Sequence, residues 1–229
     1  MSRVMLLHGL ASSFARNWRD PGWVDLLTEA GHDVTPLSLP GHGLGPQPTD
    51  PQAYADNTGH LLREITRAIG NGGARTAAVG FSAGADGLLN AAAQAPARFD
   101  RLALLGIGDA ALADDTTATD RLAAALAGPE DPTDVPTRLF RRMAAAAGND
   151  LPPIVAYLRR PRRPPEPEEL KRIACPVLLV LGDRDPAGPA DRLAGALPDA
   201  RLVTLRGVDH FTTTSSPAAM EAVMRFLAA

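Results

Sequence analysis

The sequence is poor in cysteine, with Cys175 as the only one among 229 residues. A single cysteine excludes an intrachain disulfide and a zinc cluster built on cysteines, and we expect neither a metal nor a cofactor. Apolar runs are also short: the run at residues 177–181 is far below the roughly 20 residues that cross a bilayer. Residues 1–7 carry neither the basic nor the long apolar part of a secretory leader, so we expect a cytoplasmic protein with no membrane partner.

Positive charge is not in excess, because 23 lysines and arginines stand against 26 aspartates and glutamates and give a net charge of -3. Proteins that bind a phosphate backbone usually carry a basic balance or a basic stripe, so we expect no nucleic-acid partner. The hydrophobic fraction of 45% and the charged fraction of 21% are typical of a packed globular chain. A chain of this length fits one domain, or one domain enlarged by an insertion.

Short apolar segments alternate with helical patterns along most of the chain. The predicted strands are Arg3–Leu7, Asp33–Leu37, Thr76–Phe81 and residues 102–107, 177–181 and 201–205. The predicted helices are residues 23–30, 54–69, 83–94 and 217–227. Several strands are apolar at successive positions, as in strands that are covered on both faces. This alternation predicts an α/β fold, with a short parallel sheet of about six strands and helices on both faces.

The segment 109–167 departs from this alternation. It contains three helical patterns, at residues 119–126, 135–147 and 152–158, and it ends in a proline-rich stretch without a strand. Prolines stiffen a connecting segment and would return the chain to the sheet. We therefore predict a helical insertion at residues 109–167, within a core made of residues 1–108 and 168–229.

One serine lies in a Gly-x-Ser-x-Gly pattern, Gly80-Phe81-Ser82-Ala83-Gly84. The pattern directly follows a predicted strand and directly precedes a predicted helix. A tight turn of this kind holds the serine in a strained backbone conformation with its hydroxyl above the sheet, and a Cβ at either glycine would clash with neighbouring backbone. Ser82 is therefore the candidate nucleophile.

A serine hydroxyl needs a base within hydrogen-bond reach, and the base needs a group that fixes its tautomer. His210 follows the sixth predicted strand, at the carboxyl edge of the sheet, where the active sites of open α/β folds gather. The other histidines fit structural roles better: His8, His32, His42 and His60. His210 is therefore the candidate base.

Two aspartates follow the fifth predicted strand, in Gly182-Asp183-Arg184-Asp185-Pro186. We favour Asp185 as the partner of His210, because a Gly-x-x-Asp spacing carries its carboxylate past the strand end toward the loop that holds the histidine. Asp183 then caps or braces the turn. Asp109, after the fourth strand, is a third candidate for the acid.

Taken together, these motifs resemble the α/β-hydrolase family over almost the whole chain. His8-Gly9-Leu10 follows the first strand, and the serine, the aspartate and the histidine follow the third, fifth and sixth strands, in the family's chain order. Leu39-Pro40-Gly41-His42-Gly43 is similar to the family's glycine turn after its second strand, although Ser38-Leu39 replaces the aspartate that often precedes it.

The resemblance implies a sheet whose strands lie in the order second, first, third, fourth, fifth, sixth. It also implies that the insertion at residues 109–167 forms a helical cap over Ser82. The family usually has two further strands before the His-Gly strand, so we expect a short sheet with an exposed edge, which leaves the oligomeric state open. The backbone N–H groups of Leu10 and Ala83 would form the oxyanion hole. The implied activity is that of a serine hydrolase, which cleaves a small or medium carboxylic ester or thioester through an acyl-enzyme on Ser82.

Other chemistries stay open, because this fold hosts several and does not settle function. The alternatives are a lyase, a cyclase or a C–C bond hydrolase that uses the same Ser82-His210-Asp185 triad, and a catalytically silent ligand-binding protein. Epoxide and haloalkane hydrolases are disfavoured, because those relatives need a carboxylate nucleophile where this chain has a serine.

The cap offers hints about the small-molecule acyl substrate. Phe140 and Met143, with other apolar residues of the cap, suggest an apolar substrate lining, and Trp18 lies near enough to the His-Gly motif to form a wall of the acyl site. A dense basic cluster closes the cap: Arg159, Arg160, Arg162 and Arg163. The cluster fits either a clasp for an anionic substrate or a solvated linker.

Overall fold

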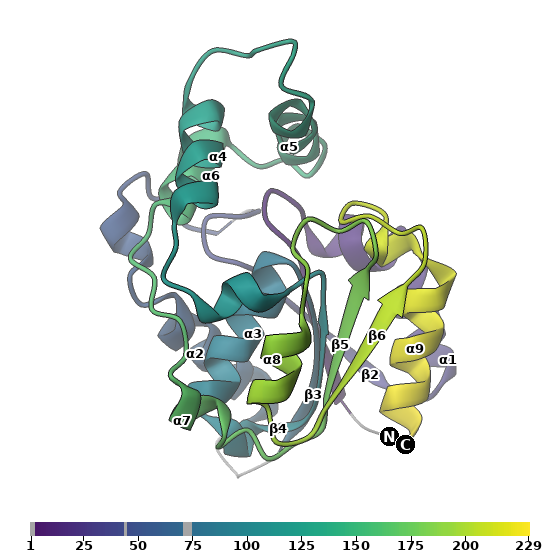
Figure 1. Cartoon of the computed structure of the whole chain (residues 1–229). Helices are drawn as coiled ribbons and strands as arrows, with labels where there is room; N and C mark the ends of the chain where they lie inside the picture. The colour runs from purple at the N-terminus through teal and green to yellow at the C-terminus, as the bar shows by residue number, and fades with distance from the viewer. Residues whose placement is uncertain (1–2, 44, 71–74) are drawn as a thin grey trace.

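The computed structural model describes residues 3–43, 45–70 and 75–229 (Figure 1). Some residues of the predicted core lie outside the described residues: 1, 2, 44 and 71–74. One sheet contains the strands β1 (Arg3–Leu7), β2 (Asp33–Leu37), β3 (Thr76–Phe81), β4 (Phe99–Leu105), β5 (Val177–Gly182) and β6 (Ala200–Leu205). All neighbours are parallel, in the order β2-β1-β3-β4-β5-β6. The predicted six-stranded parallel sheet and its strand order are confirmed.

Helices connect the strands. The α-helices are α1 (Trp23–Glu29), α2 (Asn57–Ile69), α3 (Ala83–Gln94), α4 (Thr117–Ala127), α5 (Val135–Ala146), α6 (Leu151–Leu158), α7 (Pro167–Leu170), α8 (Asp191–Ala196) and α9 (Pro217–Ala228). The shorter turns of 3-10 or π geometry are η1 (Ala15–Arg19), η2 (Pro51–Tyr54), η3 (Pro96–Arg98), η4 (Asp109–Leu112) and η5 (Thr213–Ser215).

The apolar core consists of two layers, because side chains alternate between the faces of the sheet along each strand. On β1, Val4 and Leu6 point to the face that packs against α1 and α9. Met5 and Leu7 point to the opposite face, which packs against α2, α3 and α8. In Figure 1, α9 and α1 lie on one side of the strands and α2, α3 and α8 on the other.

Between β4 and β5 the chain runs through η4, α4, α5, α6 and α7, and the described residues of this stretch contain no strand. Figure 1 shows α4, α5 and α6 beyond the carboxyl ends of the strands, and α7 back beside the sheet. Buried residues of α4 and α6, such as Leu126 and Ile154, join the apolar layer on the α3 face. The three helices predicted within residues 109–167 are present as α4, α5 and α6, close to their predicted bounds.

Two elements begin three residues away from their predicted starts, and the others differ less. The helix predicted at residues 54–69 begins at Asn57, because the Asp56 side chain accepts the N–H of Gly59 at 3.1 Å and caps the helix there. The strand predicted at residues 102–107 is Phe99–Leu105, because Gly106 takes a left-handed φ of 63° and turns the chain out of the sheet.

Candidate active site

Ser82 lies on the turn between β3 and α3, with a φ of 53° and a ψ of -120°. A residue with a Cβ is strained in this left-handed region. A Cβ on Gly80 would lie 2.8 Å from backbone atoms of Gly84, and a Cβ on Gly84 would lie 2.5 Å from the carbonyl oxygens of Leu7 and His8. The turn therefore needs both glycines, and it presents the serine at the carboxyl edge of the sheet.

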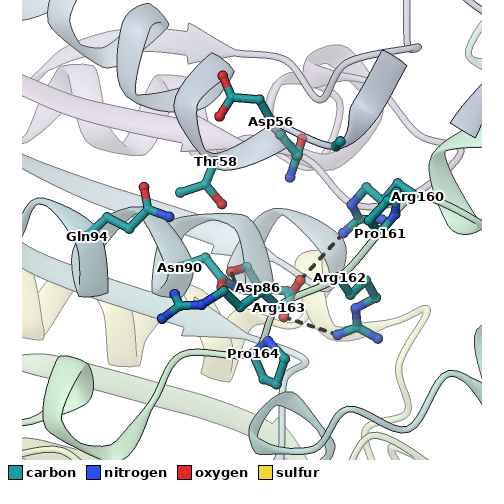
Figure 2. Close-up of a pocket in the computed structure, with 12 residues that line it drawn as sticks. Asp56, Thr58, Asp86, Asn90, Gln94, Arg160, Pro161, Arg162, Arg163 and Pro164 are labelled. Atoms are coloured by element: carbon teal, nitrogen blue, oxygen red, sulfur yellow. Dashed lines mark hydrogen bonds and ion pairs between the residues drawn. The ribbon is translucent and has the colours of Figure 1, made fainter. Parts of the chain in front are cut away.

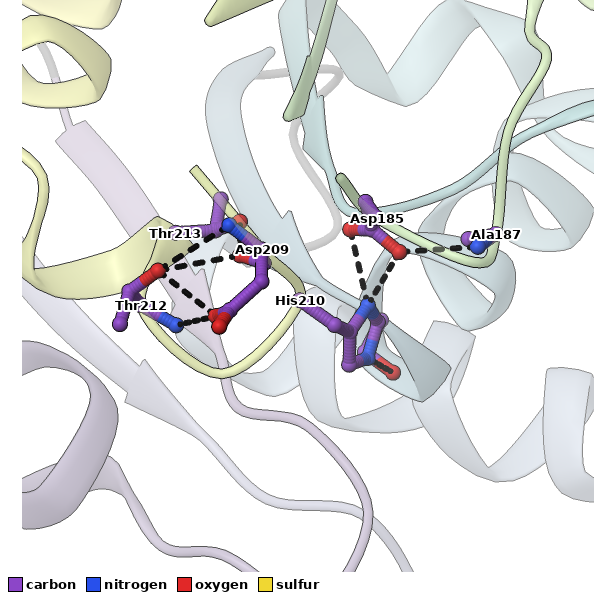
Figure 3. A network of polar contacts seen from close by, with 7 residues as sticks. Asp185, Ala187, Asp209, His210, Thr212 and Thr213 are labelled. Carbon is purple, nitrogen blue, oxygen red and sulfur yellow. Dashed lines mark hydrogen bonds and ion pairs between the residues drawn. The ribbon is translucent and has the colours of Figure 1, made fainter. Parts of the chain in front are cut away.

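The structure brings together the three residues that the sequence predicts as nucleophile, base and acid. Nε2 of His210 lies 2.9 Å from Ser82 Oγ. Nδ1 of the same ring lies 2.9 Å from each carboxylate oxygen of Asp185. Figure 3 shows the His210 ring beside the Asp185 carboxylate. The Asp185 side chain has an exposed fraction of 0% and that of His210 has 15%. A serine hydroxyl, an imidazole and a buried carboxylate thus form one continuous hydrogen-bonded chain.

Neighbouring groups fix the acid and the base. The N–H of Ala187 donates to Asp185 Oδ1 at 2.8 Å, which holds the carboxylate in place. On the loop after β6, Asp209 Oδ1 accepts the N–H of Thr212 at 2.9 Å and forms a compact turn beside His210 (Figure 3). These hydrogen bonds keep the imidazole between the carboxylate and the serine.

The other two candidate acids have different partners. Oδ1 of Asp183 accepts the N–H of Gly207 at 2.7 Å, so Asp183 braces the turn, as the sequence predicts. Oδ1 of Asp109 accepts the N–H of Leu193 at 2.9 Å and ties η4 to α8. Of the three aspartates, only Asp185 contacts the imidazole.

The backbone N–H groups of Leu10 and Ala83 are the predicted oxyanion donors. Ala83 is the first residue of α3, so its N–H has no partner within the helix. Within the described ranges, neither N–H donates to another group of the protein. The carbonyl of His8 approaches Gly84 closely, which places the loop that carries Leu10 against the start of α3. Two unused backbone donors therefore flank the nucleophile turn.

Side chains on both sides of Leu10 hold this loop. The N–H of Gly9 donates to Asn17 Oδ1, and the N–H of Ala11 donates to His42 Nε2, both at 2.9 Å. Ala11 has a φ of 56°, which is strained for alanine. The buried acceptors on Asn17 and His42 fix the loop in the conformation that leaves the Leu10 N–H unpaired.

His8 and His42 have the structural roles predicted for them. Nδ1 of His8 lies 2.8 Å from Gly9 O, and its Nε2 accepts the N–H of Leu39 at 3.4 Å. Nδ1 of His42 lies 3.0 Å from Pro40 O. Burial lowers the pKa of His8 to about 4 and the pKa of His42 to about 3. Both rings are therefore neutral at neutral pH and can accept from backbone N–H groups.

Asn149, between α5 and α6, ties the cap region to the loops around the nucleophile. It is buried; its Oδ1 accepts the N–H of Gly43 at 2.8 Å and its Nδ2 donates to Ser12 O at 2.9 Å. Its two partners lie 106 and 137 residues away in the chain. The sequence therefore carries no local signal for this contact, and sequence analysis did not select Asn149.

A cavity of about 490 Å³, here called the cap pocket, opens beside the triad. Its lining includes Ser12, Arg16, Phe81, Leu139, Arg142, Met143 and Phe211. Met143 therefore lines a cavity, and its contact with a substrate stays a prediction. Phe140 packs against the Phe211 ring at a centroid distance of 5.6 Å, so it supports this wall from behind.

The prediction that Trp18 forms a wall of the acyl site is wrong. Its exposed fraction is 0%, and its ring packs edge to face on Trp23 at a centroid distance of 5.4 Å. The indole belongs to the apolar layer between the sheet, α1 and α9. Its apolar area is buried in the core, because η1 turns it toward the sheet rather than toward the cap pocket.

The arginine cluster at the end of the cap is mostly neutralised (Figure 2). Arg160 and Arg162 pair with Asp86 of α3 at 3.7 Å and 3.6 Å. The Arg160 guanidinium also stacks on the Tyr157 ring at 3.9 Å, and only 9% of its side chain is exposed. Arg163 pairs with Glu169. Arg160 and Arg162 thus anchor this segment to α3, a role that the sequence does not predict. Arg159 and Arg163 are exposed, as in a solvated linker, and the role of an anion clasp stays a prediction.

The one cysteine of the sequence, Cys175, is buried. Burial raises the pKa of the Cys175 thiol to about 11, so thiolate is scarce at neutral pH. The described residues contain no group of three or more His, Cys, Asp or Glu side chains that could hold a metal ion. Across the same residues, the helices are too short or too polar to cross a membrane.

The parallel sheet carries a strained Gly-x-Ser-x-Gly turn, and Asp185 and then His210 follow it along the chain. These features define the α/β-hydrolase class. The comparisons with known proteins agree with this class. The model of the alpha/beta hydrolase family matches residues 4–223, so the chain belongs to that family. A search of the curated proteins found no match.

Solved structures of the same fold resemble the chain closely. A hydrolase from Pseudomonas aeruginosa PA01 superimposes with a TM-score of 0.76 at 23% identity, over 100% of this chain and 90% of the other. The enol-lactonase from Burkholderia xenovorans LB400 has a TM-score of 0.72 at 23% identity, over 100% and 92%. A thermophilic esterase from Thermogutta terrifontis has a TM-score of 0.70 at 19% identity, over 100% and 90%. At these identities the likeness establishes the fold.

Proposed function

We propose that this protein is a serine hydrolase that cleaves small or medium carboxylic esters, or thioesters, through an acyl-enzyme on Ser82. The observation that carries the proposal is the hydrogen-bonded chain from Ser82 Oγ through His210 to Asp185, with 2.9 Å at each step. The strained conformation of Ser82 adds to it, because strain of this kind gathers at functional sites.

In the acylation step, His210 Nε2 takes the hydroxyl proton as Ser82 Oγ bonds to the acyl carbon. The carbonyl oxygen becomes an oxyanion, which accepts hydrogen bonds from the N–H groups of Leu10 and Ala83. The Asp185 carboxylate accepts a hydrogen bond from Nδ1–H, so it fixes the tautomer and stabilises the imidazolium. When the tetrahedral intermediate collapses, the leaving alkoxide or thiolate takes the proton from Nε2.

Deacylation reverses these roles with water. His210 removes a proton from a water molecule, the resulting hydroxide attacks the acyl carbon, and the proton returns to Ser82 Oγ as the carboxylic acid leaves. The same two N–H groups receive the second oxyanion. We assign the substrate to the cap pocket, and we propose that residues 109–167 act as its cap over a core of residues 1–108 and 168–229.

The similar structures support a hydrolytic reaction in general. They include a protein described as an esterase and another described as an enol-lactonase, both of which carry this fold. Both names denote cleavage of an acyl–oxygen bond. The choice of an ester or thioester for this chain depends on the triad geometry rather than on those names.

The proposal is tested with purified protein and a series of 4-nitrophenyl esters, from acetate to decanoate, together with acyl thioesters. We expect the wild type to cleave at least some of these esters or thioesters, and we expect a His210→Ala variant to be slower by several orders of magnitude. The matched control is His60→Ala, which removes a histidine from α2 and should keep the wild-type rate.

Equal rates in the two histidine variants would contradict the proposal. Absence of turnover for every ester and thioester in the wild type would also contradict it, and would point to a lyase, a cyclase, a C–C bond hydrolase or a silent binding protein on the same fold.

A further inference from the structure

The cap pocket adjoins the proposed catalytic groups in three places. Phe81 precedes Ser82, Phe211 follows His210, and Ser12 belongs to the same loop as Leu10. The Phe81 ring lies 5.0 Å from the His210 ring, centroid to centroid. The cavity of about 490 Å³ is within the usual range for a small-molecule site. A group bound in this pocket would therefore lie next to the reacting acyl carbon.

Two arginines face this cavity from opposite sides. Arg16 comes from η1 on the core side, and Arg142 comes from α5 on the cap side. Among the described residues, the rest of the lining is uncharged, and it includes Leu139, Met143 and Phe211. The pocket is thus electropositive in a protein whose net charge is -3.

The two guanidinium groups are incompletely paired. Within the described part of the chain, Arg142 has no ion pair. Arg16 contacts Asp20 and the carbonyl of Ala146 at 3.4 Å each, and 53% of its side chain is exposed. In contrast, Arg160 is stacked, largely buried and paired with Asp86. Arg142 is the arginine on the cap side that lines this pocket, and it is free to meet a ligand there.

We infer that the cap pocket recognises a carboxylate at the far end of the substrate's acyl chain. Arg142 and Arg16 form ion pairs with this carboxylate, because a guanidinium presents paired N–H donors that match carboxylate oxygens. Leu139, Met143 and Phe211 pack against the methylene groups between the carboxylate and the scissile bond. This inference rests on the proposed hydrolase function and specifies its substrate class: monoesters or monothioesters of dicarboxylic acids.

The test compares two esters that differ only in charge at the far end. One is the mono-4-nitrophenyl ester of adipic acid, and the other is the same compound with its free carboxylate capped as a methyl ester. The measured quantity is the ratio of kcat/KM for the charged ester to kcat/KM for the capped ester. This ratio cancels any general effect of a variant on folding or on the triad.

We expect the wild type to favour the charged ester. An Arg16→Gln/Arg142→Gln double variant should lower the ratio about tenfold or more, which corresponds to about 1.4 kcal/mol. Raising the ionic strength should lower the wild-type ratio as well, because exposed charges are screened over about 8 Å at physiological salt. The matched control is Arg159→Gln, which removes a cap arginine that lines a different cavity and should keep the wild-type ratio.

A ratio that is the same in the wild type and the double variant would overturn the inference while leaving the hydrolase proposal intact. If neither ester is cleaved, the hydrolase proposal fails, and calorimetric titration with adipate then tests the pocket by itself. Adipate binding that the double variant weakens about tenfold would still support the carboxylate site. Equal binding, or no binding, in both proteins would overturn it.

Discussion

Replacement of Asp185 by asparagine perturbs the triad at its least exposed point. The Asp185 side chain has an exposed fraction of 0%, so the amide of the variant occupies the same buried space and is not solvated. The Ala187 N–H donates to Oδ1, which favours the amide oxygen at that position. The amide NH2 group then takes the place of Oδ2, which lies 2.9 Å from His210 Nδ1. The NH2 group is within hydrogen-bond reach of Nδ1, and the tautomer in which Nδ1 accepts from it carries the ring proton on Nε2.

A proton on Nε2 prevents His210 from accepting the Ser82 proton. The expected loss in kcat is about 10⁴-fold, or about 5 kcal/mol, which is the scale for an acid-to-amide change in a serine triad. The assay is release of 4-nitrophenolate from a short-chain ester, with circular dichroism to verify folding. The matched control is Asp183→Asn, because Asp183 only accepts a backbone N–H at the turn. A variant Asp185→Asn that keeps a tenth of the wild-type rate would refute this reasoning, as would a greater loss in Asp183→Asn.

Further predictions concern the residues that support the site. Burial lowers the pKa of His42 from 6.5 to about 3, so the unfolded chain binds this proton more readily than the folded chain. The free energy of unfolding should therefore fall as the pH drops from about 6.5 toward 4, by up to about 1.4 kcal/mol per pH unit. Urea denaturation of His42→Gln should show a shallower fall, and an unchanged slope would contradict the assignment. Gly84→Ala should lose at least about 1–3 kcal/mol in thermal denaturation, because its Cβ would lie 2.5 Å from two carbonyl oxygens. The control Gly195→Ala meets open space in α8 and should gain up to about 1 kcal/mol; similar losses in both would refute the steric argument. Asp86→Asn should cost about 1–3 kcal/mol, because it leaves two arginines unpaired at a largely buried site, whereas Glu221→Gln in an exposed pair should cost less than about 1 kcal/mol. Equal costs in chemical denaturation would count against the anchor.

There is a physical reason why the sequence predicts the sheet and the proximity of Ser82, His210 and Asp185. Strands that are covered on both faces have continuous apolar runs, and the turn at Ser82 requires glycine on both sides. Both signals are local. His210 and Asp185 follow strands whose carboxyl ends meet at one edge, so their positions along the chain place them near the serine.

Features that depend on contacts between distant segments could not be predicted in this way. Asn149 bonds to loops more than a hundred residues away, and no local pattern distinguishes it from a loop asparagine. Trp18 was misplaced because its distance from His8 along the chain says nothing about the direction in which η1 turns the indole. The ion pairs of Arg160 with α3 likewise depend on how the cap region folds back over the core.

The most direct test of the account is covalent labelling of the nucleophile. A fluorophosphonate probe reacts with a serine that is activated by a neighbouring base, and peptide mass spectrometry then locates the adduct. The account predicts one adduct, on the peptide that contains Ser82, with labelling that runs in parallel with the loss of esterase activity and is absent from Ser82→Ala. An adduct on another residue, or equal labelling of Ser82→Ala, would contradict the assignment of Ser82 as the nucleophile.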